Sequence, residues 1–423
     1  MFRAVVLLAV ILAVMCASAA AQALSTDEQK LASYIDAHQQ DQIALLERVV
    51  NLQSPTENLR GVRQVGMVFK AQLEALGLRA KWIEMPPAMK RAGHLVAQTN
   101  GAKGKRILLL GHIDTVLGGE KFRREGNRAF GSGTVDMKAG DLVLLYALKA
   151  LDSIGALKDT RIIVVLTGDE ETAGRPIEIS RRDVVDAAKN SDLALSFEAA
   201  AGTRATVGRR GSSNWTLEVA GQTGHSAGIF QDDAGAGAIF EAARIINQFY
   251  DALHKEKYLT FNPSVIVGGT TASLDVTSGT ASGKSNVIPA KVLVSGDLRF
   301  LSEKQKEEAR AKMREIVARN LPRTSAKITF EDRYPAMTPN DGNYAVLKQL
   351  DQVSRDMGGP KVEALDPSQR GAGDIAFVSH LIPGLDGIGA AGGGAHAPGE
   401  FVELDSLPML TKRAAILIYR LTR

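Results

Sequence analysis

Apolar positions recur with two different periods in the first half of the chain, and these periods predict its elements. Helical spacing is found over 26–50, 62–76, 141–151 and 184–189. Short apolar runs typical of strands cover 79–84, 94–99, 106–110, 161–166 and 193–196. Because strands alternate with helices, we expect an α/β fold with a mostly parallel or mixed sheet flanked by helices.

The pattern changes near Gly208 and returns after Pro335. Strands are expected at 213–220, 264–267, 271–276, 292–300 and 326–331, with helices at 233–253 and 302–320. This β-α-β-β-α-β order is that of a ferredoxin-like domain. Helices at 344–357, 374–379 and 404–421 then resume the first pattern. We therefore predict one α/β domain formed by 24–209 and 333–423, with a ferredoxin-like α+β domain inserted at 210–332.

The first 23 residues have the pattern of a signal peptide. Arg3 precedes an apolar run from Ala4 to Met15, and small residues with Ala-x-Ala spacing follow. A retained membrane anchor is the alternative, but the run is short for a bilayer span. We expect a periplasmic or secreted protein with no membrane contact after cleavage.

The cysteine count and the net charge exclude some classes of site and partner. Cys16, the only cysteine, lies in the predicted signal peptide, so the mature chain would contain neither a disulfide nor a catalytic thiolate. The net charge of +4 is small for 423 residues, and removal of Arg3 lowers it by one. A nearly balanced surface gives no reason to expect a nucleic-acid partner.

His112 and Asp114 follow the buried strand 106–110. Alternate residues of an extended chain point to the same side, so both can face one way at the carboxyl end of the strand. In open α/β sheets, ligands bind at that edge. A loop histidine beside a solvated acid is the alternative for this pair alone.

Further acids and a second histidine follow predicted strands or lie in Gly-rich turns. Glu170 and Glu171 come after strand 161–166, and Glu198 comes after strand 193–196. Asp136 lies in a Gly-flanked turn, where a helix N-cap is the alternative, and His396 lies in a Gly-rich loop. Two histidines and three or four carboxylates, without sulfur, suit one or two Zn²⁺ ions, and Mn²⁺ or Co²⁺ would also fit. A bridging carboxylate can hold two such metals.

Seven short motifs make the chain similar to a known family. They are GHIDTV at Gly111, GTVDMKAG at Gly133, GDEETAG at Gly168, SFEA at Ser196, GQTGHSAG at Gly221, SNVIPA at Ser285 and GAHAPGE at Gly394. In this order they resemble the di-zinc aminoacylase/carboxypeptidase family of metallopeptidases, and most closely its glutamate carboxypeptidase branch.

The resemblance implies a role for each residue of the cluster, with two zinc ions per subunit. His112 and Glu198 would bind one zinc, Glu171 and His396 the other, and Asp136 would bridge them. Glu170 would be the general base that takes a proton from the metal-bridged water. Asp114 would hold His112 in the ligating tautomer.

The resemblance extends to the inserted domain and the last loop. The counterpart of His225 reaches across a homodimer interface to the substrate carbonyl, and Asn286 and Arg299 match residues that bind the substrate carboxylate. Gly392, Gly393 and Gly394 would let the backbone approach substrate. On its own, His225 fits a histidine of a surface loop and Arg299 a charge on a strand surface, and the three glycines fit a flexible turn. The stretches 213–220 and 264–276 are candidates for an edge strand that pairs between subunits.

We therefore expect an exported zinc exopeptidase that releases a C-terminal amino acid, glutamate-like in character, from a small peptide or an N-acyl amino acid. An N-acyl-amino-acid deacylase or a dipeptidase with the same site is the alternative. A binding protein without catalysis is disfavoured because Glu170 and every expected ligand are present.

Overall fold

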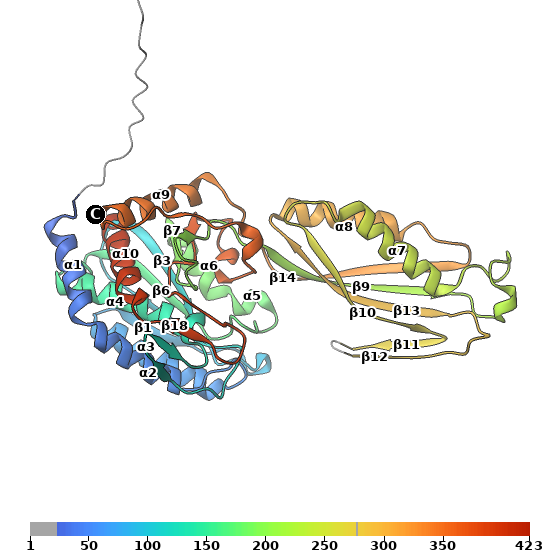
Figure 1. The fold of residues 1–423 in the computed structure, drawn as a ribbon, viewed down its shortest axis with the longest axis horizontal. Coiled ribbons are helices and arrows are strands. Elements are labelled where there is room, and N and C mark those ends of the chain that lie inside the picture. The colour runs from blue at the N-terminus through green and yellow to red at the C-terminus, as the bar shows by residue number, and fades with distance from the viewer. Residues whose placement is uncertain (1–22, 276–277) are drawn as a thin grey trace, which may run out of the picture.

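The structure is a computed structural model that describes residues 23–275 and 278–423, which form two lobes joined at a narrow waist (Figure 1). The predicted signal segment, except Ala23, lies outside the described residues. Within the described part of the chain, no helix is both long and apolar enough to cross a membrane.

The larger lobe is built on a six-stranded sheet with the order β1-β2-β6-β3-β7-β16. The strands are β1 (Arg79–Ile83), β2 (His94–Gln98), β3 (Lys103–His112), β6 (Thr160–Thr167), β7 (Leu193–Ser196) and β16 (Gly384–Leu385). β3 runs parallel to β6 and β7, whereas β2 runs antiparallel to β1 and β6. The sheet is therefore mixed, and its parallel part contains the three strands that precede the predicted ligands.

Both faces of this sheet are covered. Leu109 of β3 packs into a core shared with the long helices, whereas Leu108 and Leu110 pack into a second core with Val184 and Ile375. Strands buried on both faces need continuous apolar sequence, which explains the unbroken run in β3. The helices are α1 (Thr26–Ala37), α2 (Gln39–Asn51), α3 (Leu59–Ala75), α4 (Ala139–Ser153), α5 (Ile177–Ser180), α6 (Arg182–Lys189), α9 (Asp341–Asp356) and α10 (Ser406–Leu421).

Short strands complete the larger lobe. A four-stranded sheet joins β4 (Arg123–Glu125), β5 (Arg128–Phe130), β18 (Phe401–Glu403) and β17 (Gly392–Gly393), and β8 (Arg204–Ala205) pairs with β15 (Glu363–Ala364). The first of these sheets brings the Gly-rich loop near residue 394 beside the turn that precedes α4.

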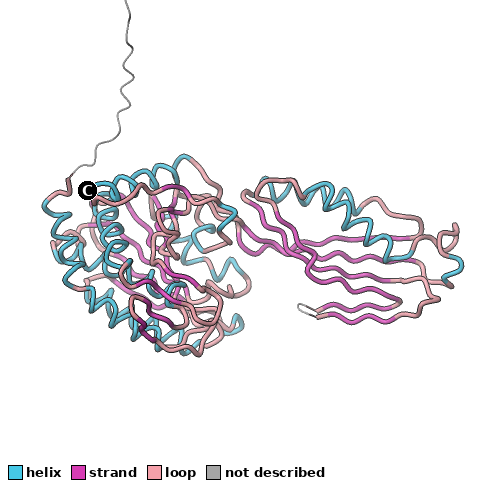
Figure 2. The backbone as a smooth tube through the Cα atoms, in the orientation of Figure 1, coloured by secondary structure: helices cyan, strands magenta, loops and turns pink. Residues whose placement is uncertain are grey.

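The smaller lobe has the predicted β-α-β-β-α-β order. Its sheet follows β10-β13-β9-β14 and is antiparallel throughout. The elements are β9 (Gly211–Gly221), α7 (Gly237–Leu253), β10 (Thr260–Gly269), β13 (Lys291–Phe300), α8 (Glu303–Val317) and β14 (Thr324–Tyr334). Figure 2 shows both helices on one face of this sheet. Trp215, Leu217 and Val219 alternate along β9 and pack into the core beneath those helices.

The chain enters and leaves the smaller lobe at adjacent points. Arg209 and Met337 exchange two backbone hydrogen bonds of 3.0 Å, so the two connecting segments run side by side. This arrangement agrees with an insertion into the larger lobe.

Several local expectations differ from the structure. The helix expected over 26–50 divides at His38, and the expected helix 374–379 is a short 3₁₀ turn, Asp374–Phe377. An extra hairpin, β11 (Thr271–Leu274) with β12 (Gly279–Ser282), interrupts the ferredoxin-like order. Of the two candidate edge stretches, β9 is interior and β10 is an edge, while Val276 lies outside the described residues.

Candidate metal centre and active site

Three parallel strands bring their carboxyl ends to one edge of the large sheet. His112 is the last residue of β3, Glu170 and Glu171 follow β6 within four residues, and Glu198 is two residues past β7. Because β3 lies between β6 and β7, these side chains meet around His112. This is the edge where open α/β sheets bind ligands.

Asp136 lies between the two histidines. Its Oδ1 is 3.2 Å from Nε2 of His112, and its Oδ2 is 3.1 Å from Nε2 of His396. Each histidine also meets one further carboxylate: Glu198 Oε1 is 3.8 Å from His112, and Glu171 Oε2 is 3.2 Å from His396. Asp136 is not a helix N-cap, because Lys138 holds that position in α4.

His112 is fixed by its second nitrogen. Nδ1 lies 3.0 Å from the backbone oxygen of Asp114 and 3.5 Å from its carboxylate, which leaves Nε2 directed at Asp136. The ring is only 1 % exposed. A carbonyl or carboxylate acceptor at one ring nitrogen is the usual partner of a metal-binding histidine.

The carboxylate of Asp114 also organises the loop that carries both glutamates. Oδ1 accepts from the backbone N–H of Glu170 at 3.0 Å, and Oδ2 accepts from the N–H of Glu171 at 3.1 Å. The hydroxyl of Thr56 donates to Oδ2 at 2.6 Å. Asp114 is fully buried, so its negative charge depends on these donors and on the histidine nearby.

The carboxylates of the cluster are buried together, and burial disfavours their charged forms. It raises the pKa of Glu198 to about 7 despite Arg209, and raises the pKa of Glu170 well above its ordinary value despite His112. Hydrogen bonds that the imidazolium of His396 donates to the carboxylates of Asp136 and Glu171 raise the pKa of this histidine to about 10. Carboxylates and imidazoles packed this tightly need a shared cation in place of protons.

The donor set fits a divalent metal. Ligand atoms of His112, Asp136 and Glu171 all lie within 4.8 Å of one another. The Oε1 atom of Glu171 is buried and has no hydrogen-bond partner, so one ligand position of this carboxylate is free. Nitrogen and oxygen donors of this kind suit Zn²⁺, Mn²⁺ or Co²⁺.

Two residues of the site were missed by sequence reasoning. The carboxylate of Glu400 accepts from the backbone N–H groups of Gly133, Val135 and Asp136, at 2.7, 2.8 and 2.9 Å, and so holds the turn that carries Asp136. Glu400 belongs to the motif GAHAPGE, which was the available signal. The guanidinium of Arg209 is buried, 3.7 Å from Glu198 and 3.3 Å from Asp386, and no periodicity marked it.

The structure does not bring every predicted residue to the cluster. β9 carries the chain away from the larger lobe, so His225, four residues past its end, lies on the side of the smaller lobe that is remote from the cluster. Asn286 lies beside it, because the backbone N–H of Ser226 donates to the backbone oxygen of Asn286 at 3.0 Å and His225 bridges to Val287. Both side chains are exposed. Arg299 pairs across the sheet with Ser212 near the waist, and its guanidinium bonds to Asp297 at 2.8 Å.

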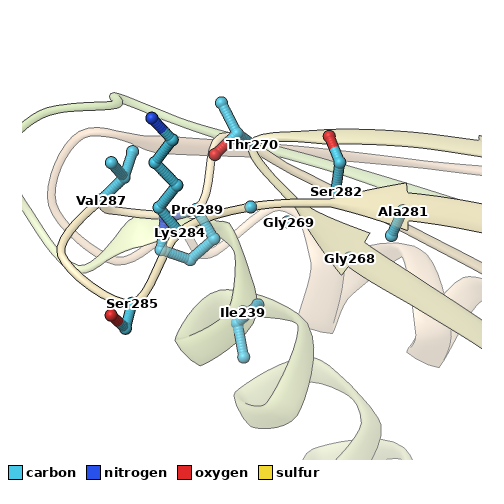
Figure 3. Close-up of a pocket in the computed structure, with 11 residues that line it drawn as sticks. Ile239, Gly268, Gly269, Thr270, Ala281, Ser282, Lys284, Ser285, Val287 and Pro289 are labelled. Atoms are coloured by element: carbon cyan, nitrogen blue, oxygen red, sulfur yellow. The ribbon is translucent and has the colours of Figure 1, made fainter.

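The motif SNVIPA borders a hollow of its own in the smaller lobe. This cavity of about 340 Å³ lies between the start of α7, at Ile239, and the segment with Lys284 and Ser285 (Figure 3). None of the predicted metal ligands lines it.

The glycines of the last loop have structural reasons of their own. A Cβ atom on Gly392 would lie 2.1 Å from the backbone oxygen of Phe401, because β17 packs tightly against β18. Gly394 has φ +77°, which favours glycine. A substrate contact of Gly392, Gly393 and Gly394 remains a prediction.

Comparisons with known proteins agree with this architecture. A model of peptidase family M20/M25/M40 matches residues 108–420. Carboxypeptidase G2 of Pseudomonas sp. (strain RS-16) is 26% identical over 392 residues, covering 89% of this chain and 88% of that protein. Succinyl-diaminopimelate desuccinylase of Gluconobacter oxydans (strain 621H) is 25% identical over 389 residues, covering 88% and 95%.

Solved structures share the fold. A tripeptidase from Staphylococcus aureus subsp. aureus Mu50 matches with a TM-score of 0.73 and 20% identity, covering 91% of this chain and 99% of that one. Human carnosine dipeptidase 1 matches with a TM-score of 0.60 and 16% identity, covering 93% and 99%. The expected resemblance to metallopeptidases is confirmed: since the family model spans most of the chain, this protein belongs to peptidase family M20/M25/M40 and is a metallopeptidase or amidohydrolase.

Proposed function

We propose that this protein is an exported di-zinc exopeptidase that releases a C-terminal, glutamate-like amino acid from a small peptide or an N-acyl amino acid. The observation that carries the proposal is the position of Asp136, with one oxygen on each of two histidines. Each histidine has a carboxylate of its own, which is the arrangement required for two metals that share a bridging ligand.

His112 and Glu198 would hold one zinc, His396 and Glu171 the other, and Asp136 would bridge them. Two divalent cations would offset most of the charge of five buried or half-buried carboxylates, namely Asp114, Asp136, Glu170, Glu171 and Glu198, while the guanidinium of Arg209 lies between Glu198 and Asp386. Bound zinc would activate a water molecule and polarise the scissile carbonyl.

Glu170 is placed to move the proton. It is next to the ligand Glu171, and burial raises its pKa well above the ordinary value of a glutamate, which strengthens it as a proton acceptor. Glu170 would take a proton from the attacking water and deliver it to the leaving amine nitrogen. A carboxylate in this role needs no metal bond of its own.

The proposed substrate class is supported by similarity to relatives and not by contacts within this chain. The similarity to carboxypeptidase G2 favours release of a C-terminal residue, and Arg299 would pair with its carboxylate. The similarity to succinyl-diaminopimelate desuccinylase favours the second candidate, an N-acyl-amino-acid deacylase with the same site, and dipeptidase activity stands with it.

A homodimer through the smaller lobe forms part of the proposal. Phe240 and Tyr250 on α7 are 53% and 57% exposed, and Ile266 on the edge strand β10 is 57% exposed. An apolar helix face beside an edge strand is a surface suited to pairing with a second copy. In such a dimer, His225 of one subunit would serve the metal centre of the other.

The test is release of amino acid by zinc-loaded mature protein from N-acyl-glutamate, N-acyl amino acids with neutral side chains, and dipeptides, with and without a chelator. Chelator-sensitive release of glutamate, faster than release from the other two classes, is expected. Preference for neutral N-acyl amino acids or for dipeptides would select the second candidate. Absence of chelator-sensitive release from all three substrate classes would refute the proposed activity.

Two further measurements test the remaining parts. Two zinc ions per chain by elemental analysis are expected, and one would remove the bridging role of Asp136. Expression with residues 1–23 should place the protein outside the cytoplasm, and sedimentation should give a dimer. A fully active monomer would remove the proposed role of His225.

A further inference from the structure

The last residue of the smaller lobe reaches the glutamate loop of the larger one. Tyr334 ends β14, and its hydroxyl donates a 2.6 Å hydrogen bond to the backbone oxygen of Glu170. The same hydroxyl accepts a 3.0 Å hydrogen bond from Nη2 of Arg181. The side chain of Tyr334 thus connects the last strand of the smaller lobe with Glu170, the proposed general base.

A β-bulge directs Tyr334 toward the larger lobe. Asp332 pairs with Ser213 across the sheet, whereas Tyr334 pairs with Ser212, so Arg333 is the extra residue of the strand. Asp332 forms an ion pair with Arg310 of α8. In a regular strand without this bulge, Arg333 would take the place opposite Ser212, and Tyr334 would point to the same face as Asp332. A bulge that re-aims one side chain is a feature often found beside active sites.

The other partner of the tyrosine is rigidly held. Arg181 is 1 % exposed, with Nη1 at 2.6 Å from Asp169 and Nε at 2.7 Å from Asp374. The ring of Tyr334 also packs edge-on against Phe377 at 5.1 Å between centroids. The hydroxyl therefore has a fixed position from which to hold the carbonyl of Glu170.

A second contact ties the same strand to the same loop. Nη1 of Arg175 donates to the backbone oxygen of Asp332 at 3.1 Å, and Nη2 lies 3.5 Å from Glu331. Arg175 directly follows the motif GDEETAG, which carries Glu170 and Glu171. The loop of the glutamates is thus bonded to β14 at both of its ends.

We propose that Tyr334 is a positioning residue that couples the smaller lobe to the loop carrying Glu170 and Glu171, so that the orientation of that lobe sets the position of the general base. Its catalytic consequence rests on the proposed function of Glu170. The hydrogen bond itself does not, and can be tested separately.

The experiment replaces one hydroxyl. Tyr334→Phe is expected to lower kcat about five- to tenfold, as loss of one hydrogen bond implies, with KM changed less than twofold and zinc content equal to that of the parent. Hydrogen–deuterium exchange of the zinc-loaded protein should become faster in the peptide that covers 168–174. Tyr419→Phe is the matched control, because its hydroxyl on α10 donates at 3.1 Å to Asp27 on α1, and neither helix carries a residue of the cluster.

The outcomes separate this inference from the proposed function. Faster exchange at 168–174 in a protein that hydrolyses none of the substrates would refute the proposed function and retain the coupling. An active parent with unchanged kcat and unchanged exchange in Tyr334→Phe would overturn the coupling. An effect on exchange as large in Tyr419→Phe would also overturn it, because the change would not be local. Arg175→Ala should loosen the same peptide, as a second contact between loop and strand.

Discussion

Replacing Asp114 by asparagine probes the residue that links His112 to the glutamate loop. The carboxylate of Asp114 accepts three hydrogen bonds, from Thr56 Oγ1 and from the backbone N–H groups of Glu170 and Glu171. An amide of the same shape has one oxygen and one NH₂ group. With its oxygen at the position of Oδ2, the variant keeps the bonds to Thr56 and Glu171 and turns its NH₂ toward the N–H of Glu170.

The magnitude follows from that single mismatch. One buried backbone donor, at Glu170, loses its acceptor, which costs about 1–3 kcal/mol of folding stability. The opposite orientation of the amide would lose two bonds, so it is disfavoured. His112 keeps its orientation, because its Nδ1 lies nearer the backbone oxygen of Asp114 than the carboxylate, at 3.0 against 3.5 Å. We therefore expect both zinc ions to remain and kcat to fall roughly 10–100-fold.

The assay combines steady-state kinetics, elemental analysis and thermal denaturation of the zinc-loaded proteins. Asp159→Asn is the control, since Asp159 forms an exposed ion pair with Lys103 at 3.3 Å. This control should match the parent in all three measurements. Loss of a zinc ion from Asp114→Asn would show that the carboxylate, not the backbone oxygen, orients His112. Activity within twofold of the parent would refute the role given to Asp114.

Three other changes test the division of labour in the cluster. Glu170→Gln should retain both zinc ions while kcat falls about 10²–10⁴-fold, because a general base is lost; loss of metal would mean that Glu170 and Glu171 have exchanged roles. His112→Ala should leave one zinc ion per chain by elemental analysis, and two would remove His112 from the ligands. The pKa of about 10 for metal-free His396 means that this imidazole is charged below that pH and must release a proton to bind metal, so zinc affinity should fall as pH falls. Calorimetry at pH 8 in two buffers of different ionisation enthalpy should show proton release that decreases in His396→Ala, and equal release in both proteins would contradict the assignment.

Much of the architecture was predictable because it depends on local pattern. The unbroken apolar run of β3 required burial on both faces, and the alternation along β9 required one covered face. Boundaries were less predictable. The helix expected over 26–50 divides at His38. The start of the first helix is marked by the capping box of Ser25 and Glu28, but the start of the second, at His38, has no side-chain cap that the sequence could reveal.

The candidate site was predictable where a residue follows a strand. His112, Glu171 and Glu198 meet because parallel strands end at one edge, a consequence of topology that the sequence pattern contains. Glu400 was predictable in part, since it lies in a recognisable motif, but its three backbone donors belong to a turn more than 260 residues away in sequence.

The sequence by itself determined the strands, their apolar faces and the kinds of ligand at their ends, because these depend on neighbours within a few residues. Only the tertiary structure decided which oxygen of Asp136 meets which histidine and that His225 lies far from the cluster of its own chain. It also decided that Tyr334 reaches Glu170. Those contacts join segments that the chain separates by up to 260 residues. The contacts of Asp136 follow from the packing of strand ends and loops within the larger lobe, and the contact of Tyr334 follows from the junction of the two lobes and from one extra residue in β14. No local pattern records either.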